Sequence, residues 1–154
     1  MDTLLTTNPL RLVRVFNAPR ERVYDAWTKA EQFMQWMCPP GSGLDRCEID
    51  PRPGGVWLAH GFRPDGSRFA KSGVYREVKR PEYLAFTWPY QAGDGCTNGD
   101  GQETTVEVTF RAIGRKTEVT LIHGPFADQA GFAGHNEGWA GTFAKLAEFI
   151  GGQS

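Results

Sequence analysis

Hydrophobic positions recur with two different periods along this chain. Over the stretch 132–150 the spacing is three and four residues, as on one face of a helix. The positions that share this face are Phe132, His135, Trp139, Phe143, Leu146 and Ile150. Gly134, Gly138 and Gly141 fall on a separate flank. Because each interior glycine weakens a helix by about 0.8–1 kcal/mol relative to alanine, this helix is expected to depend on packing against a broad apolar surface.

Before this stretch the period is two over most of the chain, which is typical of strands. The strands predicted in this way span residues 10–16, 44–50, 55–63, 68–79, 82–90, 102–112 and 115–123. All but one of the joints between the last six are short, so neighbouring strands are expected to be antiparallel. Alternation is cleanest in the last three strands, whose apolar faces carry Leu84, Phe86 and Trp88; Thr104, Val106, Val108 and Phe110; and Thr117, Val119, Leu121 and His123.

Two short helices are predicted between the first and second strands. Pro19 and Glu21 are typical of a helix start, and the segment 31–37, which carries Phe33 and Trp36, ends before two prolines. The order of elements predicts an α+β fold: a curved antiparallel sheet of about seven strands wrapped round the long C-terminal helix, in one domain over 1–154. A helix does not fill a curved sheet, so a cavity is expected between them.

Composition and charge exclude several classes of protein. The 154 residues carry a net charge of −1, so nothing points to nucleic acid or an anionic membrane as a partner. The sequence has no apolar run near the roughly 20 residues of a membrane span, and its first residues lack the features of a signal peptide. Three widely spaced cysteines, Cys38, Cys47 and Cys96, favour reduced thiols and a cytoplasmic location.

Aromatic residues dominate the surfaces that would face the expected cavity. The chain has 5 Trp, 10 Phe and 4 Tyr, and such rings commonly line ligand pockets. The predicted ligand-pocket residues are Trp36, Trp57, His60, Phe86, Trp88, His123, His135, Trp139 and Phe143. For the strand 55–63 the inner face stays open, because Trp57 competes with Val56, Leu58, His60 and Phe62 for the inside. The alternative to a pocket is a filled aromatic core.

Three interpretations of the histidines His60, His123 and His135 stay open. His123 and His135 are candidates for a proton-transfer pair, because imidazole titrates near neutrality. A metal site with His60 or a cysteine is a second interpretation, and hydrogen-bonded structural histidines are the third. The sequence has no HxxxH or CxxC spacing, so neither a metal nor a cofactor is predicted, and no catalytic residue is assigned.

Several stretches of the chain resemble the START-like or SRPBCC superfamily. Within it they are most similar to stand-alone bacterial proteins related to the C-terminal domain of the activator of Hsp90 ATPase (AHSA1-like). These stretches are FNAPRERVYDAWTKAEQFMQWMCPPG at 16–41, PGGVW at 53–57, PDG at 64–66, GVYREVKRPEYLAFTW at 73–88, TVEVTFRAIGRKTEVTLIH at 105–123 and GW at 138–139. The resemblance implies a helix-grip fold, in which a sheet grips a C-terminal helix around an apolar pocket.

Three functions follow as hypotheses from this cavity and this resemblance. The preferred one is the binding of a small hydrophobic or aromatic molecule. A second is a small-molecule enzyme, cyclase-like or hydrolase-like, that uses pocket histidines. The third is interaction with an Hsp90-type chaperone, which the resemblance suggests by name. Separately, the glycine flank of the C-terminal helix predicts close contact with an early helix or with a second subunit in a homodimer.

Overall fold

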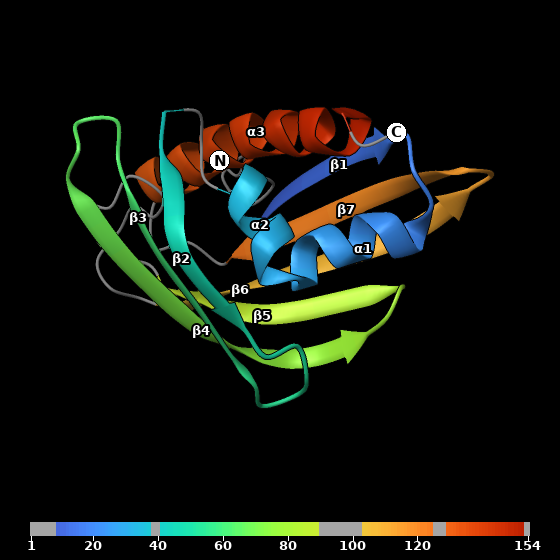
Figure 1. Cartoon of the computed structure of the whole chain (residues 1–154), viewed down its shortest axis with the longest axis horizontal. Helices are drawn as coiled ribbons and strands as arrows, with labels where there is room; N and C mark the ends of the chain where they lie inside the picture. Colours follow the sequence, from blue (N-terminus) through green and yellow to red (C-terminus); the bar gives the residue numbers. More distant parts are fainter. Residues whose placement is uncertain (1–8, 38–40, 90–102, 125–128, 153–154) are drawn as a thin grey trace, which may run out of the picture.

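The computed structural model describes residues 9–37, 41–89, 103–124 and 129–152, and the side chains of the last range from Gly138 onward. Figure 1 shows the elements in order along the chain. They are β1 (Leu10–Phe16), α1 (Arg20–Thr28), α2 (Ala30–Trp36), β2 (Gly43–Ile49), β3 (Val56–Phe62), β4 (Arg68–Lys79), β5 (Tyr83–Pro89), β6 (Glu103–Ile113), β7 (Lys116–Gly124) and α3 (Gln129–Gly152). Each predicted strand boundary agrees with these bounds to within one residue.

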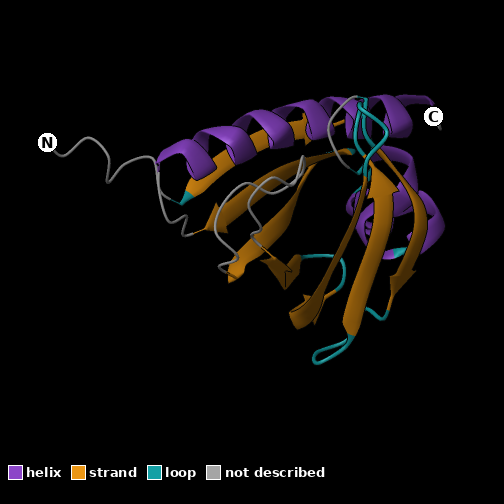
Figure 2. Ribbon diagram, turned by 90° about the vertical axis from the view of Figure 1, so that its left-hand side faces the viewer, coloured by secondary structure: helices purple, strands orange, loops and turns teal. Residues whose placement is uncertain are grey.

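The described strands form one antiparallel sheet. Its order is β1-β7-β6-β5-β4-β3-β2, so the first strand of the chain pairs with the last. The sheet curves strongly, and α3 runs along it at the side of β1 (Figure 2). The structure thus confirms the predicted α+β helix-grip fold, with two short helices after the first strand and a long helix at the C-terminal end.

The inner face of the sheet is built by the three strands with the cleanest alternation. The side chains predicted to share one face in β5, β6 and β7 are all buried, including the polar Thr104, Thr117 and His123. A period of two puts every second side chain on the same face, and this face is the one that needs cover. Alternation therefore identified the part of the core that these three strands supply.

The inner face of β3 is set by its tryptophan. Trp57 and Ala59 are buried, whereas Val56 is 53% and Phe62 38% exposed. The indole N–H of Trp57 donates to the carbonyl oxygen of Thr87 on β5 at 3.1 Å, so the ring reaches across β4. A glycine is needed beneath it, because a Cβ at Gly73 would lie 2.4 Å from the Trp57 indole nitrogen.

All three helices cover the sheet. On α3 the stripe of Trp139, Phe143, Leu146 and Ile150 is buried, and this helix packs beside β1 and α2. The short helix α1 packs on β6 and β7 through a stripe that contains the fully buried Trp27. The two early helices share the cover with α3 because they carry buried apolar stripes of their own.

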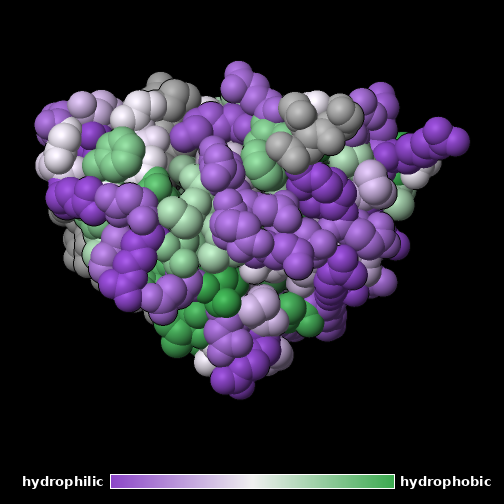
Figure 3. Space-filling model, in the orientation of Figure 1, coloured by the Kyte–Doolittle hydropathy of each residue, from purple (hydrophilic) through white to green (hydrophobic). Residues whose placement is uncertain are grey.

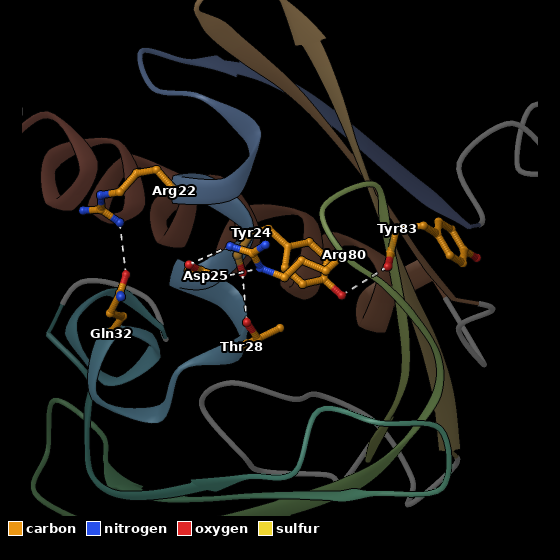
Figure 4. A network of polar contacts seen from close by, with 7 residues as sticks. All are labelled: Arg22, Tyr24, Asp25, Thr28, Gln32, Arg80 and Tyr83. Atoms are coloured by element: carbon orange, nitrogen blue, oxygen red, sulfur yellow. Dashed lines mark hydrogen bonds and ion pairs between the residues drawn. The ribbon is translucent and has the colours of Figure 1, made fainter.

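Polar contacts fix α1 in this position (Figure 4). The guanidinium group of Arg80, after β4, donates to both carboxylate oxygens of Asp25 at 3.0 and 3.2 Å. Arg22 donates to the side-chain oxygen of Gln32 at 3.0 Å and so joins α1 to α2. Figure 3 shows hydrophilic side chains over these helices and hydrophobic ones gathered below them, over the strands.

Within the described ranges, no helix is both long and apolar enough to cross a membrane.

Candidate functional site

All five tryptophans of the chain form one continuous series of ring contacts, which we call the tryptophan series. Its members come from five elements, and all are buried. In spatial order they are Trp57, Trp88, Trp139, Trp27 and Trp36, with successive ring centroids 5.3, 5.4, 6.0 and 4.7 Å apart. The series therefore runs from the sheet through α3 to the short helices. Phe86 lies beside Trp57 and Trp88, and Phe143 beside Trp139.

The indole N–H groups of this series fall into two classes. Those of Trp36, Trp57 and Trp139 donate to Ala26 O, Thr87 O and His123 Nδ1 at 3.0, 3.1 and 2.9 Å. Those of Trp27 and Trp88 are buried without a hydrogen-bond partner among the described residues. A buried donor that makes no bond loses its hydration without compensation. These two N–H groups are therefore places in the core where a hydrogen-bond acceptor is missing among the described residues.

His123 lies fully buried next to the series, and its tautomer follows from its partners. The Trp139 indole only donates, so His123 Nδ1 must accept. Nε2 then carries the proton and donates to Thr104 Oγ1 at 2.7 Å. The Thr104 hydroxyl in turn donates to the carbonyl oxygen of Trp88 at 3.1 Å. Since both ring nitrogens are engaged, this geometry is that of a histidine that positions two tryptophans rather than of a free general base.

A buried lysine, Lys71, lies beside the same rings. It is 4% exposed, and its Nζ has no hydrogen-bond partner among the described residues. The ammonium group lies 5.0 Å from the centroid of the Phe69 ring and 4.7 Å from that of Trp88. A cation over aromatic faces gains electrostatic stabilisation, but the rings accept no conventional hydrogen bond from its N–H groups.

The structure brings most of the predicted pocket residues together. Trp36, Trp57, Phe86, Trp88, His123, Trp139 and Phe143 all lie in or against the tryptophan series. His60 does not, because it alternates with Trp57 and Ala59 and points from the opposite face of β3, where it is only partly buried. His135 and Phe132 lie on α3 but outside the described side chains, so the proposed pairing of His123 with His135 stays a prediction. Cys38 lies outside the described residues altogether.

Neither Lys71 nor Trp27 is among the predicted pocket residues, although Lys71 lies over the Trp88 ring and Trp27 stacks on Trp139. Neither face of β4 is uniformly apolar in sequence: one carries Arg68, Ala70 and Ser72, and the other carries Phe69, Lys71 and Gly73. The signal that was available is the spacing of Phe69 and Tyr75, two buried rings six residues apart. Because side chains alternate in a strand, an inward Phe69 and Tyr75 place Lys71 inward as well.

One thiol and two phenols near the core have raised pKa values. Burial raises the pKa of the Cys47 thiol to about 12, and the neighbouring Glu48 adds to this. Burial likewise raises the pKa of the Tyr24 phenol to about 12, although the Arg80 charge opposes the shift. Burial also raises the pKa of the Tyr75 phenol. A nucleophilic thiol or phenolate needs a lowered pKa, so these groups do not supply one.

Among the described residues no cluster suited to a metal ion occurs, and the described hollows lie away from the tryptophan series. In the part of the chain that the structure describes, no three His, Cys, Asp or Glu groups come together as a metal ion would require. A hollow of about 600 Å³ opens at the turn between β2 and β3, where Asp50, Arg52 and Ser72 are among its lining residues. It lies on the face of the sheet that carries Val56 and Leu58, opposite to Trp57.

Comparison with known proteins places this geometry in context. The model of the family described as activator of Hsp90 ATPase homolog 1-like protein (AHSA1) matches residues 17–151. A comparison with curated proteins gives no match.

Solved structures of bacterial proteins share the fold over nearly the whole chain. An AHSA1 protein from Silicibacter pomeroyi has a TM-score of 0.80 and 26% identity, with 94% of this chain and 99% of that chain covered. A protein from Chromobacterium violaceum gives 0.81 and 24%, with 93% and 96% covered. A protein from Nitrosomonas europaea gives 0.77 and 22%, with 99% and 98% covered.

Proposed function

Since the chain belongs to the family of activator of Hsp90 ATPase homolog 1-like proteins, we propose that it uses the helix-grip fold to bind a small hydrophobic or aromatic molecule. The binding surface in this proposal is the part of the tryptophan series that joins the sheet to α3, namely Trp57, Trp88 and Trp139. These rings come from three different elements, so a ligand in contact with them would lie between the sheet and the C-terminal helix.

One observation carries the proposal: the indole N–H of Trp88, in the middle of this surface, is buried without a partner among the described residues. Buried polar groups in folded proteins almost always have a hydrogen-bond partner. A filled core needs the bulk of the Trp88 ring, which contacts Trp57, Phe86 and Trp139, but it has no use for an unpaired N–H group. A donor kept at this place instead supports a surface that meets an acceptor atom from outside the described residues.

His123 supports the same interpretation through its role in positioning. It receives the Trp139 N–H and, through Thr104, is connected to the backbone of Trp88. The hydrogen bond orients the Trp139 ring, and the edge of the imidazole also packs against the Trp88 ring, so both rings have a defined neighbour before any ligand arrives. A preorganised surface loses less freedom on binding, which favours a binding protein over a plastic core. The engaged ring nitrogens make His123 a weaker candidate for catalysis.

The test is binding of a neutral ring compound, methyl naphthalene-2-carboxylate, measured by isothermal titration calorimetry and by thermal unfolding. We expect saturable binding and a melting temperature that rises with ligand concentration, by mass action. Trp88→Leu should weaken binding, whereas Tyr83→Phe, a ring substitution on a half-buried residue whose hydroxyl bonds Glu107, should leave it unchanged. Native mass spectrometry of protein from its own host then looks for a co-purified small molecule. If no compound of this class binds and only the bare chain is found, the tryptophan series is a filled core and a protein-interaction role becomes the better proposal.

A further inference from the structure

Lys71 is the one described lysine that the core encloses, and nothing in the fold described above requires its charge. Its side chain is 4% exposed and its Nζ has no hydrogen-bond partner among the described residues. Its inward neighbours on β4 are Phe69 and Gly73, and its Cα partner on β3 is Ala59. None of these three side chains has an acceptor atom. An ammonium group has three N–H donors, and burial without a partner for them is costly.

The ring faces around Lys71 offset only part of the free-energy cost of burying its ammonium group. Phe69 and Trp88 lie with their centroids 5.0 and 4.7 Å from Nζ, and both rings stabilise a positive charge rather than a neutral amine. The ring faces therefore stabilise positive charge but supply no hydrogen-bond acceptor to the ammonium group. A buried cation in this condition is a place for an anion.

A second open donor belongs to the same cluster. Trp88, the ring on which the Lys71 ammonium group lies, is the tryptophan whose buried N–H also has no described partner. Indole N–H and ammonium groups donate and do not accept. A ligand that satisfies both must present acceptor atoms to both, and one that carries negative charge also neutralises Lys71. A ligand cation, or a ligand whose polar group only donates, does not fit this pair.

We propose that the ligand of this site is an aromatic or similarly apolar carboxylate, with its anionic group held by Lys71 Nζ and Trp88 Nε1. The apolar body of the ligand then lies against Trp57, Trp88 and Trp139. This inference rests on the proposed binding function and adds the chemistry of the head group. A carboxylate fits better than a phosphate, because a single buried cation and a single indole donor match one charge and two acceptor atoms.

The experiment compares three probes with one ring system and different head groups: naphthalene-2-carboxylate, its methyl ester and 2-naphthylmethylammonium. Calorimetric titration of the wild-type protein should give about tenfold tighter binding for the carboxylate than for the ester, a difference typical of one charge-assisted contact. The ammonium compound should bind more weakly than the ester. Equal affinity for ester and carboxylate would overturn the carboxylate proposal and leave the binding function standing, whereas absence of binding by all three would overturn both.

Lys71→Met tests the residue itself, because methionine keeps the length of the side chain and removes its charge. The preference for the carboxylate over the ester should disappear while the affinity for the ester is kept. Lys79→Met, at an exposed position of the same strand, is the matched control and should keep the preference. Trp88→Phe, which keeps an aromatic ring and removes the N–H, should lower carboxylate affinity more than ester affinity.

A thermal readout separates this role from a structural one. Replacing a buried, unpaired charge by an apolar side chain is commonly neutral or stabilising, so Lys71→Met should melt at the same temperature as the wild-type protein or higher when no ligand is present. If Lys71 serves only as a structural cation over Phe69 and Trp88, the variant should melt lower and the wild-type protein should show no carboxylate preference, and the proposal would be wrong.

Discussion

His123 shows how one buried polar side chain determines the arrangement of several rings. Sequence spacing placed it on the inner face of β7, and the structure gives it two partners with opposite requirements. Trp139 needs an acceptor, and Thr104, whose hydroxyl already donates to Trp88 O, needs a donor, so a neutral imidazole with its proton on Nε2 satisfies both. The residue thereby links α3 to the sheet by a polar bridge inside an apolar core.

Substitution of His123 by leucine measures the strength of that bridge. The apolar side chain would leave the Trp139 N–H without an acceptor and would remove the bond that Thr104 accepts, although Thr104 keeps its bond to Trp88 O; an unsatisfied buried group costs about 1–3 kcal/mol. We therefore expect His123→Leu to lower the free energy of unfolding by about 2–5 kcal/mol in urea titration. Thr120→Leu, a partly buried position on the same strand, is the control. A loss below about 1 kcal/mol would mean that the bridge contributes little to stability.

The ease of predicting a residue depended on how regular its strand is. Phe86, Trp88 and His123 belong to strands with clean alternation, and all three lie where the pattern placed them. His60 is predicted in the pocket together with Trp57 because β3 carries large residues on both faces, although the two positions are three residues apart and therefore face opposite sides. Lys71 is not predicted in the pocket because a lysine is usually exposed. Its inward direction follows only when Phe69 and Tyr75 are taken to mark the inner face of β4.

At the scale of elements, the crossing of β4 by the Trp57 ring is the contact that joins three strands. The indole nitrogen donates to Thr87 O on β5, and Gly73 on the intervening β4 leaves space for the ring. The motif PGGVW was noted from sequence as part of a resemblance. Its tryptophan acquires a physical role only when the register of β3, β4 and β5 is known.

Gly73→Ala tests this crossing. A methyl group there would lie 2.4 Å from the Trp57 indole nitrogen and 2.3 Å from Thr87 O, which is closer than real contacts allow, so the ring or the strand must move. Overpacking of this kind typically costs about 1–3 kcal/mol. Chemical denaturation should show this loss, and tryptophan emission should change as the ring is displaced. Ser72→Ala, at the exposed neighbouring position, serves as the control, and equal stability of both variants would contradict the account.

The C-terminal helix was predicted from its period of 3.6, and the buried stripe from Trp139 to Ile150 confirms that pattern. The pattern does not show which part of the sheet each helix covers. The early helices are short, and only tertiary packing shows that Trp27 lies between Trp139 and Trp36. The predicted role of the glycine flank, in contact with an early helix or in a homodimer, stays a prediction.

At the scale of the whole molecule, the fold can be predicted from sequence more completely than the site. Period, joint length and order of elements specify the antiparallel sheet and its helix, because each is a local property repeated many times. The site depends on which buried donors remain without partners. Trp36, Trp57 and Trp139 are as aromatic as Trp27 and Trp88, yet only their N–H groups are satisfied by described residues. That distinction comes from three-dimensional contacts alone.

The central claim, that a ligand meets the tryptophan series at Trp88, is tested most directly by the indole N–H resonances in nitrogen-15 NMR spectra. Each tryptophan gives one such resonance, which assignment by single Trp→Phe variants identifies. Titration with naphthalene-2-carboxylate should move the Trp88 resonance downfield further than the others, because its N–H acquires an acceptor, while those of Trp36, Trp57 and Trp139 keep theirs. Indole resonances that all stay in place at saturating probe, or move without a distinct change at Trp88, would contradict the account.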